Sequence, residues 1–187
     1  MQGDGTQFVY AGDEGSRVLL WFRERIRAVG TCVGSGLLEA SLTLLYSGIE
    51  TLGFLAACPG ENAATKKTFT DWCEKYLLTR LGSVDGRPLT ALDFYAARCG
   101  VLHTSSSVSD LGRGGIAREI SYRFQGRDGV ILILDAKLEP VLLDIEAFAR
   151  AFKEGGKAFL ADLKRDRIRA ETAEERARSF FTWETLQ

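Results

Sequence analysis

The single histidine of the chain, His103, stands five positions after Arg98, at the end of an apolar segment. A histidine side chain changes its charge near neutral pH, so it can take up or release a proton during a reaction. An arginine guanidinium can hold an anionic group such as a phosphate through paired hydrogen bonds. Together the two residues suggest chemistry on a phosphodiester. The same pair also fits a structural role, with a buried histidine at a helix end and a surface arginine.

The helix predicted over residues 90–104 places these two side chains on different faces. At about 100° per residue, Arg98 and His103 lie about 140° apart around the helix axis. His103 falls within the predicted core face, which comprises Leu92, Tyr95, Ala96, Cys99 and Leu102. The opposite side is also apolar, with Phe94, Ala97 and Val101. A helix covered on two sides is central in its bundle or lies at a subunit interface, and a symmetric dimer would bring two copies of the Arg/His pair together.

A polar stripe on an earlier predicted helix supplies candidate companions. Four residues recur there at steps of four, three and four, opposite the leucine face: Glu39, Thr43, Tyr46 and Glu50. Such a stripe is commonly solvated. If it instead faces the helix with the motif, we expect Glu50 to orient Arg98 or His103 and Tyr46 to donate a hydrogen bond.

Basic residues after the motif are candidates for contacts with a nucleic-acid backbone. Arg113 and Arg118 flank a polar, glycine-rich loop, and Lys137 lies further along the chain. They are predicted to contact phosphates of RNA, the alternative being scattered surface charge. The loop glycines do not predict a nucleoside-triphosphate site, because no strand precedes them and no Lys-Ser/Thr pair follows.

Length, charge and apolar content restrict the class of protein. With 187 residues, 45% of them hydrophobic, the chain predicts one compact domain. The 24 basic and 25 acidic residues balance, so the chain lacks the strong basic footprint of a typical nucleic-acid binder. Any RNA contact must therefore be local or assembled across subunits. The longest apolar segment, residues 36–57, contains two glutamates, which argues against a membrane span.

The cysteines and the N-terminus predict a reducing compartment. The four cysteines are far apart and match no paired metal-ligand spacing: Cys32, Cys58, Cys73 and Cys99. We expect buried free thiols, no metal and no cofactor. The first residues lack the basic-then-apolar order of a secretory signal, so the expected location is cytoplasmic, without a membrane partner.

Hydrophobic periodicity predicts a mainly α fold, a bundle of four to six helices with a small β-hairpin. After a loose segment over residues 1–15, a single domain is predicted over residues 16–187. The predicted helices cover residues 17–29, capped by Ser16 and ended by Gly30, then 36–57, 65–81, 90–104, 141–165 and 170–187. The helix over residues 141–165 is expected to be weak at Gly155-Gly156. The hairpin is predicted near residues 116–134, with strands over 116–124 and 130–134.

The order of motifs resembles the HEPN superfamily of small helical proteins, whose motif is an arginine, four to six variable residues and a histidine. The context is LYSGIE at residues 45–50, FTDWCEKYLL at 69–78 and DFYAARCGVLHT at 93–104. This order looks like that of a bacterial HEPN-like family, and the resemblance covers roughly residues 37–122. Many active members have a polar residue after the arginine, where this chain has Cys99.

The resemblance implies a bundle that dimerises so that the Arg/His segments of two chains face one cleft. It further implies a metal-independent endoribonuclease, of toxin or phage-defence type, in which His103 acts on the ribose 2′-hydroxyl and Arg98 stabilises charge on the scissile phosphate. The alternative is an inactive HEPN-like RNA-binding, scaffolding or dimerisation module. A third possibility is a protein active only beside a partner from its own operon, as in toxin-antitoxin pairs.

Overall fold

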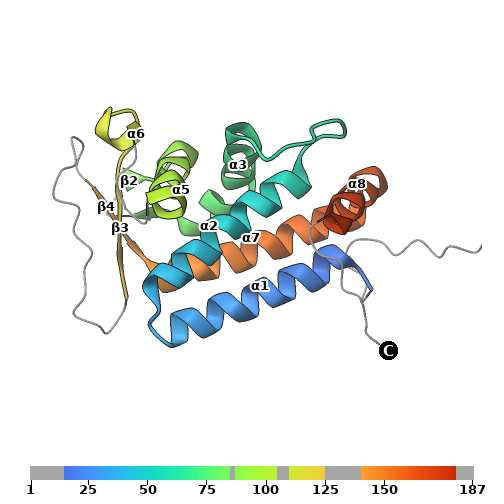
Figure 1. Ribbon diagram of the computed structural model, residues 1–187, viewed down its shortest axis with the longest axis horizontal. Coiled ribbons are helices and arrows are strands. Elements are labelled where there is room, and N and C mark those ends of the chain that lie inside the picture. Colours follow the sequence, from blue (N-terminus) through green and yellow to red (C-terminus); the bar gives the residue numbers. More distant parts are fainter. Residues whose placement is uncertain (1–14, 85–86, 105–109, 125–139, 180–187) are drawn as a thin grey trace, which may run out of the picture.

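A computed structural model describes residues 15–84, 87–104, 110–124 and 140–179 of the chain. The fold is mainly α, as the sequence predicts (Figure 1). Three long helices pack against one another: α1 (Arg17–Gly34), α2 (Leu38–Ala56) and α7 (Ile145–Arg165). Helices α3 (Lys66–Trp72) and α5 (Ala91–Thr104) pack on α2. The last described helix, α8 (Arg167–Arg178), packs on α1, α2 and α7.

Short elements connect these helices. They are the π-helical turn η1 (Cys73–Leu77), α4 (Leu78–Leu81), β1 (Ser83–Val84), β2 (Arg87–Pro88), α6 (Asp110–Arg113), β3 (Ile120–Arg123) and β4 (Val141–Asp144). In the described part of the chain, no helix is long and apolar enough to cross a membrane.

Helix α1 starts where the sequence predicts and ends later. The Ser16 hydroxyl caps it by accepting a hydrogen bond from the amide of Leu19 at 3.1 Å. The prediction that Gly30 ends the helix was wrong, because α1 continues to Gly34. One glycine inside a helix costs only about 1 kcal/mol. Packing of Val29 and Val33 on the core offsets that cost.

The predicted helix over residues 65–81 is present as three consecutive helical elements. It begins at a capping box, in which Thr65 and Thr68 bond each other's backbone amides through their side chains. The turn η1 then widens the helix by one residue. Trp72, Cys73, Tyr76 and Leu77 are all buried along this stretch.

The small sheet differs from the predicted hairpin. A strand is present at β3, but its described neighbour is β4, and the two run parallel with Ile120 opposite Val141. Residues 130–134, the other predicted strand, lie outside the described part. Residues 141–144 were predicted as helix and are strand, because they pair with β3. Helix α7 begins after them, where the Asp144 side chain caps it by accepting from the amide of Ala147 at 2.8 Å. The predicted turn before α5 holds a short antiparallel pair, β1 and β2.

The glycines of α7 are contact points. The helix runs without interruption from Ile145 to Arg165, so the expected weak point at Gly155-Gly156 is not observed. A Cβ added at Gly155 would lie 2.7 Å from the carbonyl oxygen of Tyr76, and one at Gly156 would lie 2.1 Å from the ring of Phe22. The absent side chains therefore allow η1 and α1 to approach α7 closely.

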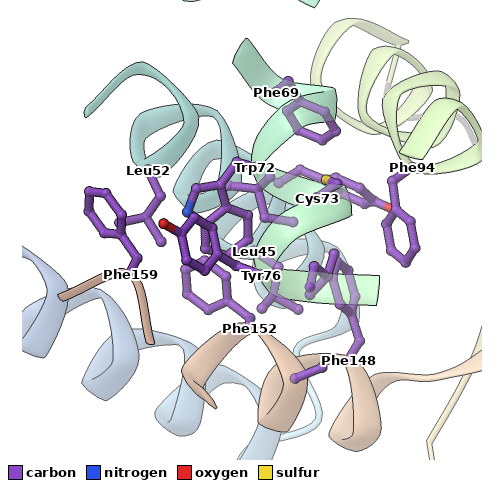
Figure 2. Close-up of a cluster of buried hydrophobic side chains, with 14 of the residues drawn as sticks. Leu45, Leu52, Phe69, Trp72, Cys73, Tyr76, Phe94, Phe148, Phe152 and Phe159 are labelled. Atoms are coloured by element: carbon purple, nitrogen blue, oxygen red, sulfur yellow. The ribbon is translucent and has the colours of Figure 1, made fainter. Parts of the chain in front are cut away.

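Aromatic side chains fill the core between these helices (Figure 2). Phe148 packs against both Phe94 and Tyr46, at ring-centroid distances of 5.3 and 5.4 Å. Trp72 packs against Phe152 at 6.2 Å. The predicted aromatic cluster at residues 180–183 lies outside the described residues.

Helix α8 fixes the ends of two earlier helices (Figure 1). The Glu174 carboxylate accepts a hydrogen bond from the Ser16 hydroxyl and one from the amide of Arg17 at 3.0 Å, at the start of α1. Arg176 donates four hydrogen bonds of 2.7 to 2.9 Å to main-chain carbonyls at and beyond the end of α2, those of Phe54, Ala57, Cys58 and Glu61. An anion at a helix N-terminus and a cation at a C-terminus both complement the helix dipole.

Candidate functional site

A buried carboxylate fixes the first turn of α5, the helix that carries the Arg/His motif. The Thr90 hydroxyl accepts from the amide of Asp93 at 3.1 Å, and Asp93 accepts in return from the amide of Thr90 at 2.9 Å. Arg118 donates to the same carboxylate from its backbone amide and its guanidinium, both at 2.8 Å. Burial raises the pKa of Asp93, but these hydrogen bonds outweigh it, and the net pKa is lowered.

Arg98 of α5 and Glu50 of α2 form an ion pair. Nε of Arg98 donates to Oε2 of Glu50 at 3.3 Å, and Nη2 donates to Oε1. Both side chains are partly accessible, 14% for Arg98 and 30% for Glu50. Burial lowers the pKa of Arg98, but the hydrogen bond and charge of Glu50 outweigh it and raise the pKa. The structure thus brings together the arginine of the motif and the glutamate of the predicted polar stripe.

Tyr46 lies in the core, one helical turn before Glu50 on α2. It is fully buried, and its hydroxyl is hydrogen-bonded to the hydroxyl of Tyr122 in β3. Burial and the neighbouring Tyr122 raise the pKa of Tyr46, so it stays protonated at neutral pH. Since Tyr46 precedes Glu50 by one helical turn, this contact holds that part of α2 against the sheet.

For most of the remaining predicted site residues, the structure does not describe the side chain. His103 belongs to α5, about 7.5 Å further along the axis than Arg98 by helical rise, but its side chain lies outside the described residues. The same holds for the side chain of Arg113 in α6, and for Lys137 altogether. Arg118 is 19% exposed and pairs with Asp93 and with the carbonyl of Pro88. Its guanidinium therefore has fixed protein partners, and a contact with RNA stays a prediction.

The buried face of α5 only partly matches the predicted one. Ala96 is buried as predicted, and so are Phe94 and Ala97 from the opposite side, whereas Tyr95 and Cys99 are half-buried. The helix is apolar on nearly every side, so its periodicity could not select the face that packs on α2.

Two half-buried neighbours of Arg98, Tyr95 and Cys99, were placed on the core face from the sequence and were not among the predicted site residues. Sγ of Cys99 lies 4.0 Å from Nη1 of Arg98. The ring of Tyr95 packs edgewise on Phe69 at 5.7 Å, and the ammonium of Lys66 lies 5.7 Å from its centre. Burial and the neighbouring Cys99 raise the pKa of Tyr95. The available signal was spacing, because Tyr95 stands one helical turn before both Arg98 and Cys99.

The described residues contain no group of three or more His, Cys, Asp or Glu side chains able to hold a metal ion. All four cysteines are free thiols. The expectation of burial is confirmed only for Cys73, because Cys32 and Cys99 are half-buried and Cys58 is exposed.

No protein-family model, curated protein or solved structure matches this chain. The chemistry of Arg98, Glu50 and their neighbours is therefore interpreted from their geometry.

Proposed function

We propose that this protein is a metal-independent endoribonuclease of the HEPN type, active in the cytoplasm as a dimer with a composite Arg/His site. One observation carries the proposal: Arg98 is held by Glu50 of a second helix, five residues before the single histidine of the chain. A partly exposed guanidinium with a raised pKa is a permanent cation that can bind a phosphate.

The proposed reaction is attack by the ribose 2′-oxygen on the adjacent phosphorus. One His103 removes the 2′-hydroxyl proton as the new P–O bond forms, and the P–O bond to the 5′-oxygen breaks. The second His103 of the dimer protonates the leaving 5′-oxygen. Arg98 stabilises the negative charge that develops on the phosphate oxygens. The products are a 2′,3′-cyclic phosphate and a 5′-hydroxyl, and no metal takes part.

In this proposal Glu50 and Tyr46 act through other residues. Glu50 orients the Arg98 guanidinium, and the buried contact between Tyr46 and Tyr122 positions α2. Arg113 and Arg118 would contact flanking phosphates.

The test is cleavage of a mixed RNA set by the purified protein in the presence of a chelator. We expect cleavage by the wild type and a loss of about 100-fold or more in the folded variants His103→Ala and Arg98→Ala. A substrate with 2′-deoxyribose at the cleaved position should resist, because it lacks the nucleophile. End analysis of the products should find cyclic phosphate and 5′-hydroxyl.

Arg27→Ala is the matched control, since Arg27 also pairs with a glutamate, Glu24, at 2.7 Å but on the exposed face of α1. It should cleave like the wild type. Equal activity of all variants, or cleavage only with added metal, would contradict the proposal.

A second candidate is an inactive RNA-binding or scaffolding module that dimerises through α5. The ion pair between Arg98 and Glu50 favours this candidate, because it occupies the guanidinium. The apolar surface of α5 on nearly every side also favours it, because such a helix can form an interface. Phe94 cannot form such an interface, because it is completely buried within the chain. Val101 is half-buried, so Val101→Glu should shift the sedimentation equilibrium toward monomer, with no RNA turnover in any variant. A partner from the same operon would be found by co-purification.

A further inference from the structure

Arg25 of α1 is a half-buried arginine outside the ion pair of Arg98 and Glu50. Its Nη1 donates to the hydroxyl of Ser47 at 2.8 Å and to the carbonyl of Leu44 at 3.4 Å, both in α2. Its guanidinium carbon lies 5.2 Å from the centre of the Trp21 ring. Contacts with two helices therefore hold the guanidinium in place, which reduces the entropy that is lost when a ligand binds to it.

The other edge of this guanidinium is formed by Nε and Nη2, and we call it the free edge of Arg25. Within the described residues neither atom has a protein acceptor, and neither is completely buried, so a ligand can reach both from solvent. The described carboxylates do not pair with Arg25, and the adjacent Glu24 pairs with Arg27 instead. Burial lowers the pKa of Arg25. A bound anion would counteract that effect.

The same edge of Arg98 binds a carboxylate. Nε and Nη2 of Arg98 both donate to Glu50, and this contact raises the pKa of Arg98. A phosphate group accepts the same paired N–H bonds as a carboxylate. The free edge of Arg25 is therefore suited to an anionic group with two acceptor oxygens.

Arg25 and Arg98 reach neighbouring positions on the surface of α2. Helix α2 lies between α1 and α5 and contacts both (Figure 1). Arg25 is bound to Ser47 and Arg98 to Glu50, and these two residues of α2 are three positions apart. Residues with this spacing are neighbours on a helix surface, with Cβ atoms about 5 to 6 Å apart. Both are half-buried, so this part of α2 keeps contact with solvent.

We propose that the free edge of Arg25 binds a phosphate of the RNA, beside the phosphate that Arg98 contacts at the cleaved position. The RNA strand crosses α2 at Ser47 and Glu50, between the two guanidinium groups. Two arginines at neighbouring positions suit the repeated phosphates of a nucleic acid better than a single carboxylate of a protein partner. This inference rests on the RNA-binding part of the proposed function and gives the substrate a further point of contact.

The experiment measures binding of a fluorescently labelled RNA pool with 2′-O-methyl riboses, which lack the proton that the proposed reaction removes. Fluorescence anisotropy gives the dissociation constant at several salt concentrations. In Arg25→Gln we expect about tenfold weaker binding, as for the loss of charge-assisted hydrogen bonds. The slope of log Kd against log salt concentration should fall by about 0.7, because one phosphate contact with a single strand is lost.

Two further variants separate this contact from a general effect of charge. Arg23→Gln also removes a charge from α1, but Arg23 is exposed and lies about 160° around the helix axis from Arg25. Its affinity for RNA should stay within about twofold of the wild type. Arg25→Lys keeps the charge and loses the paired donors, so it should keep the salt slope and bind RNA about threefold more weakly than the wild type. Urea denaturation verifies that each variant is folded.

Cleavage of unmodified RNA separates the role of Arg25 from that of Arg98. Arg25→Gln should raise KM about tenfold and change kcat less, because a contact with a flanking phosphate is made equally in the ground state and the transition state. Arg98→Ala should instead lower kcat, because Arg98 stabilises charge that develops during the reaction.

Equal affinity and equal salt slope in Arg25→Gln and the wild type would overturn the inference, even if the wild type cleaves RNA. An equal loss of affinity in Arg23→Gln would also refute it, because the effect would then be one of general charge. Binding through Arg25 without any cleavage would support the inference and contradict the ribonuclease proposal. Absence of RNA binding by the folded wild type would overturn both proposals and favour a carboxylate of a protein partner as the ligand of Arg25.

Discussion

Two arginines of this protein, Arg176 and Arg98, sit in contrasting surroundings. Arg176 of α8 donates to four main-chain carbonyls that belong to the end of α2 and the loop after it. Arg98 of α5 donates to the side-chain carboxylate of Glu50, and its Nη1 lies 4.0 Å from the sulfur of Cys99. The first arginine is bound to main-chain oxygens, which have less freedom to move than the end of a side chain. The second is tied to a side chain that can change rotamer.

The difference separates an arginine that stabilises the fold from one suited to binding. A phosphate can share or replace a carboxylate at a guanidinium, since both accept paired N–H bonds. It cannot replace helix-end carbonyls without leaving them unpaired. We therefore expect changes at Arg176 to alter stability, and changes around Arg98 to alter activity.

Arg176→Ala is expected to cause the largest loss of stability. Removal of the guanidinium takes one hydrogen bond from each of four carbonyls. The free energy of unfolding, measured by urea denaturation, should therefore fall by about 3 kcal/mol. RNA cleavage per folded molecule should not change. Arg178→Ala, an exposed change on the same helix, should stay within about 0.5 kcal/mol of the wild type. If both variants lose the same stability, the role assigned to the Arg176 contacts is wrong.

Asp93→Asn is expected to have an intermediate, pH-dependent effect. The folded-state pKa of Asp93 lies below its ordinary value of 3.8, so the ionised carboxylate stabilises the protein above that value. This contribution is lost as the pH falls through the lowered pKa. At pH 7 the variant should be about 2 kcal/mol less stable, and the difference from the wild type should narrow below pH 3.8. Thermal or urea unfolding at several pH values measures the difference in stability between the variant and the wild type. A difference that does not change with pH would contradict a stabilising role of the ionised Asp93 carboxylate.

Glu50→Gln is expected to have the smallest effect on stability. Glutamine keeps the shape and can accept a hydrogen bond from Arg98, so the free energy of unfolding should change by about 1 kcal/mol or less. Cleavage of RNA should fall about tenfold or more, because Arg98 is no longer oriented by a charge. Glu24→Gln, which breaks the exposed pair with Arg27, should leave cleavage unchanged. A loss of stability as large as that of Arg176→Ala would remove the contrast between the two arginines.

The sequence predicted the helices well where caps and apolar stripes agreed. Ser16 was predicted as the cap of the first helix, the helix predicted from residue 65 begins there as α3, and the helix predicted over residues 36–57 is α2 to within two residues. Positions decided by long-range packing were not predictable. Gly30 is helical because Val29 and Val33 of the same helix pack on the core, and Gly155 is helical where η1 approaches α7 closely. Val141–Asp144 is a strand because β3 lies beside it.

The candidate site was predictable where it depends on spacing along one helix, and not where it depends on contacts between distant segments. The spacing along α2 suggested that Glu50 could reach Arg98, and the two are hydrogen-bonded. Tyr46 belonged to the same stripe, yet its partner Tyr122 is 76 residues away and could not be read from local spacing. Arg118 is hydrogen-bonded to Asp93, which is 25 residues earlier in the chain, so this contact could not be predicted from local spacing either.

The contacts of Glu174 also determine when the bundle can be completed during folding. They join residues of α1 and α8 that are 158 positions apart in the chain. Loop closure over such a separation is entropically costly, so these contacts form late. Until α8 docks, the first turn of α1 lacks its carboxylate and the end of α2 lacks its guanidinium. During synthesis, both early helices therefore remain incompletely capped until the last described helix has been made.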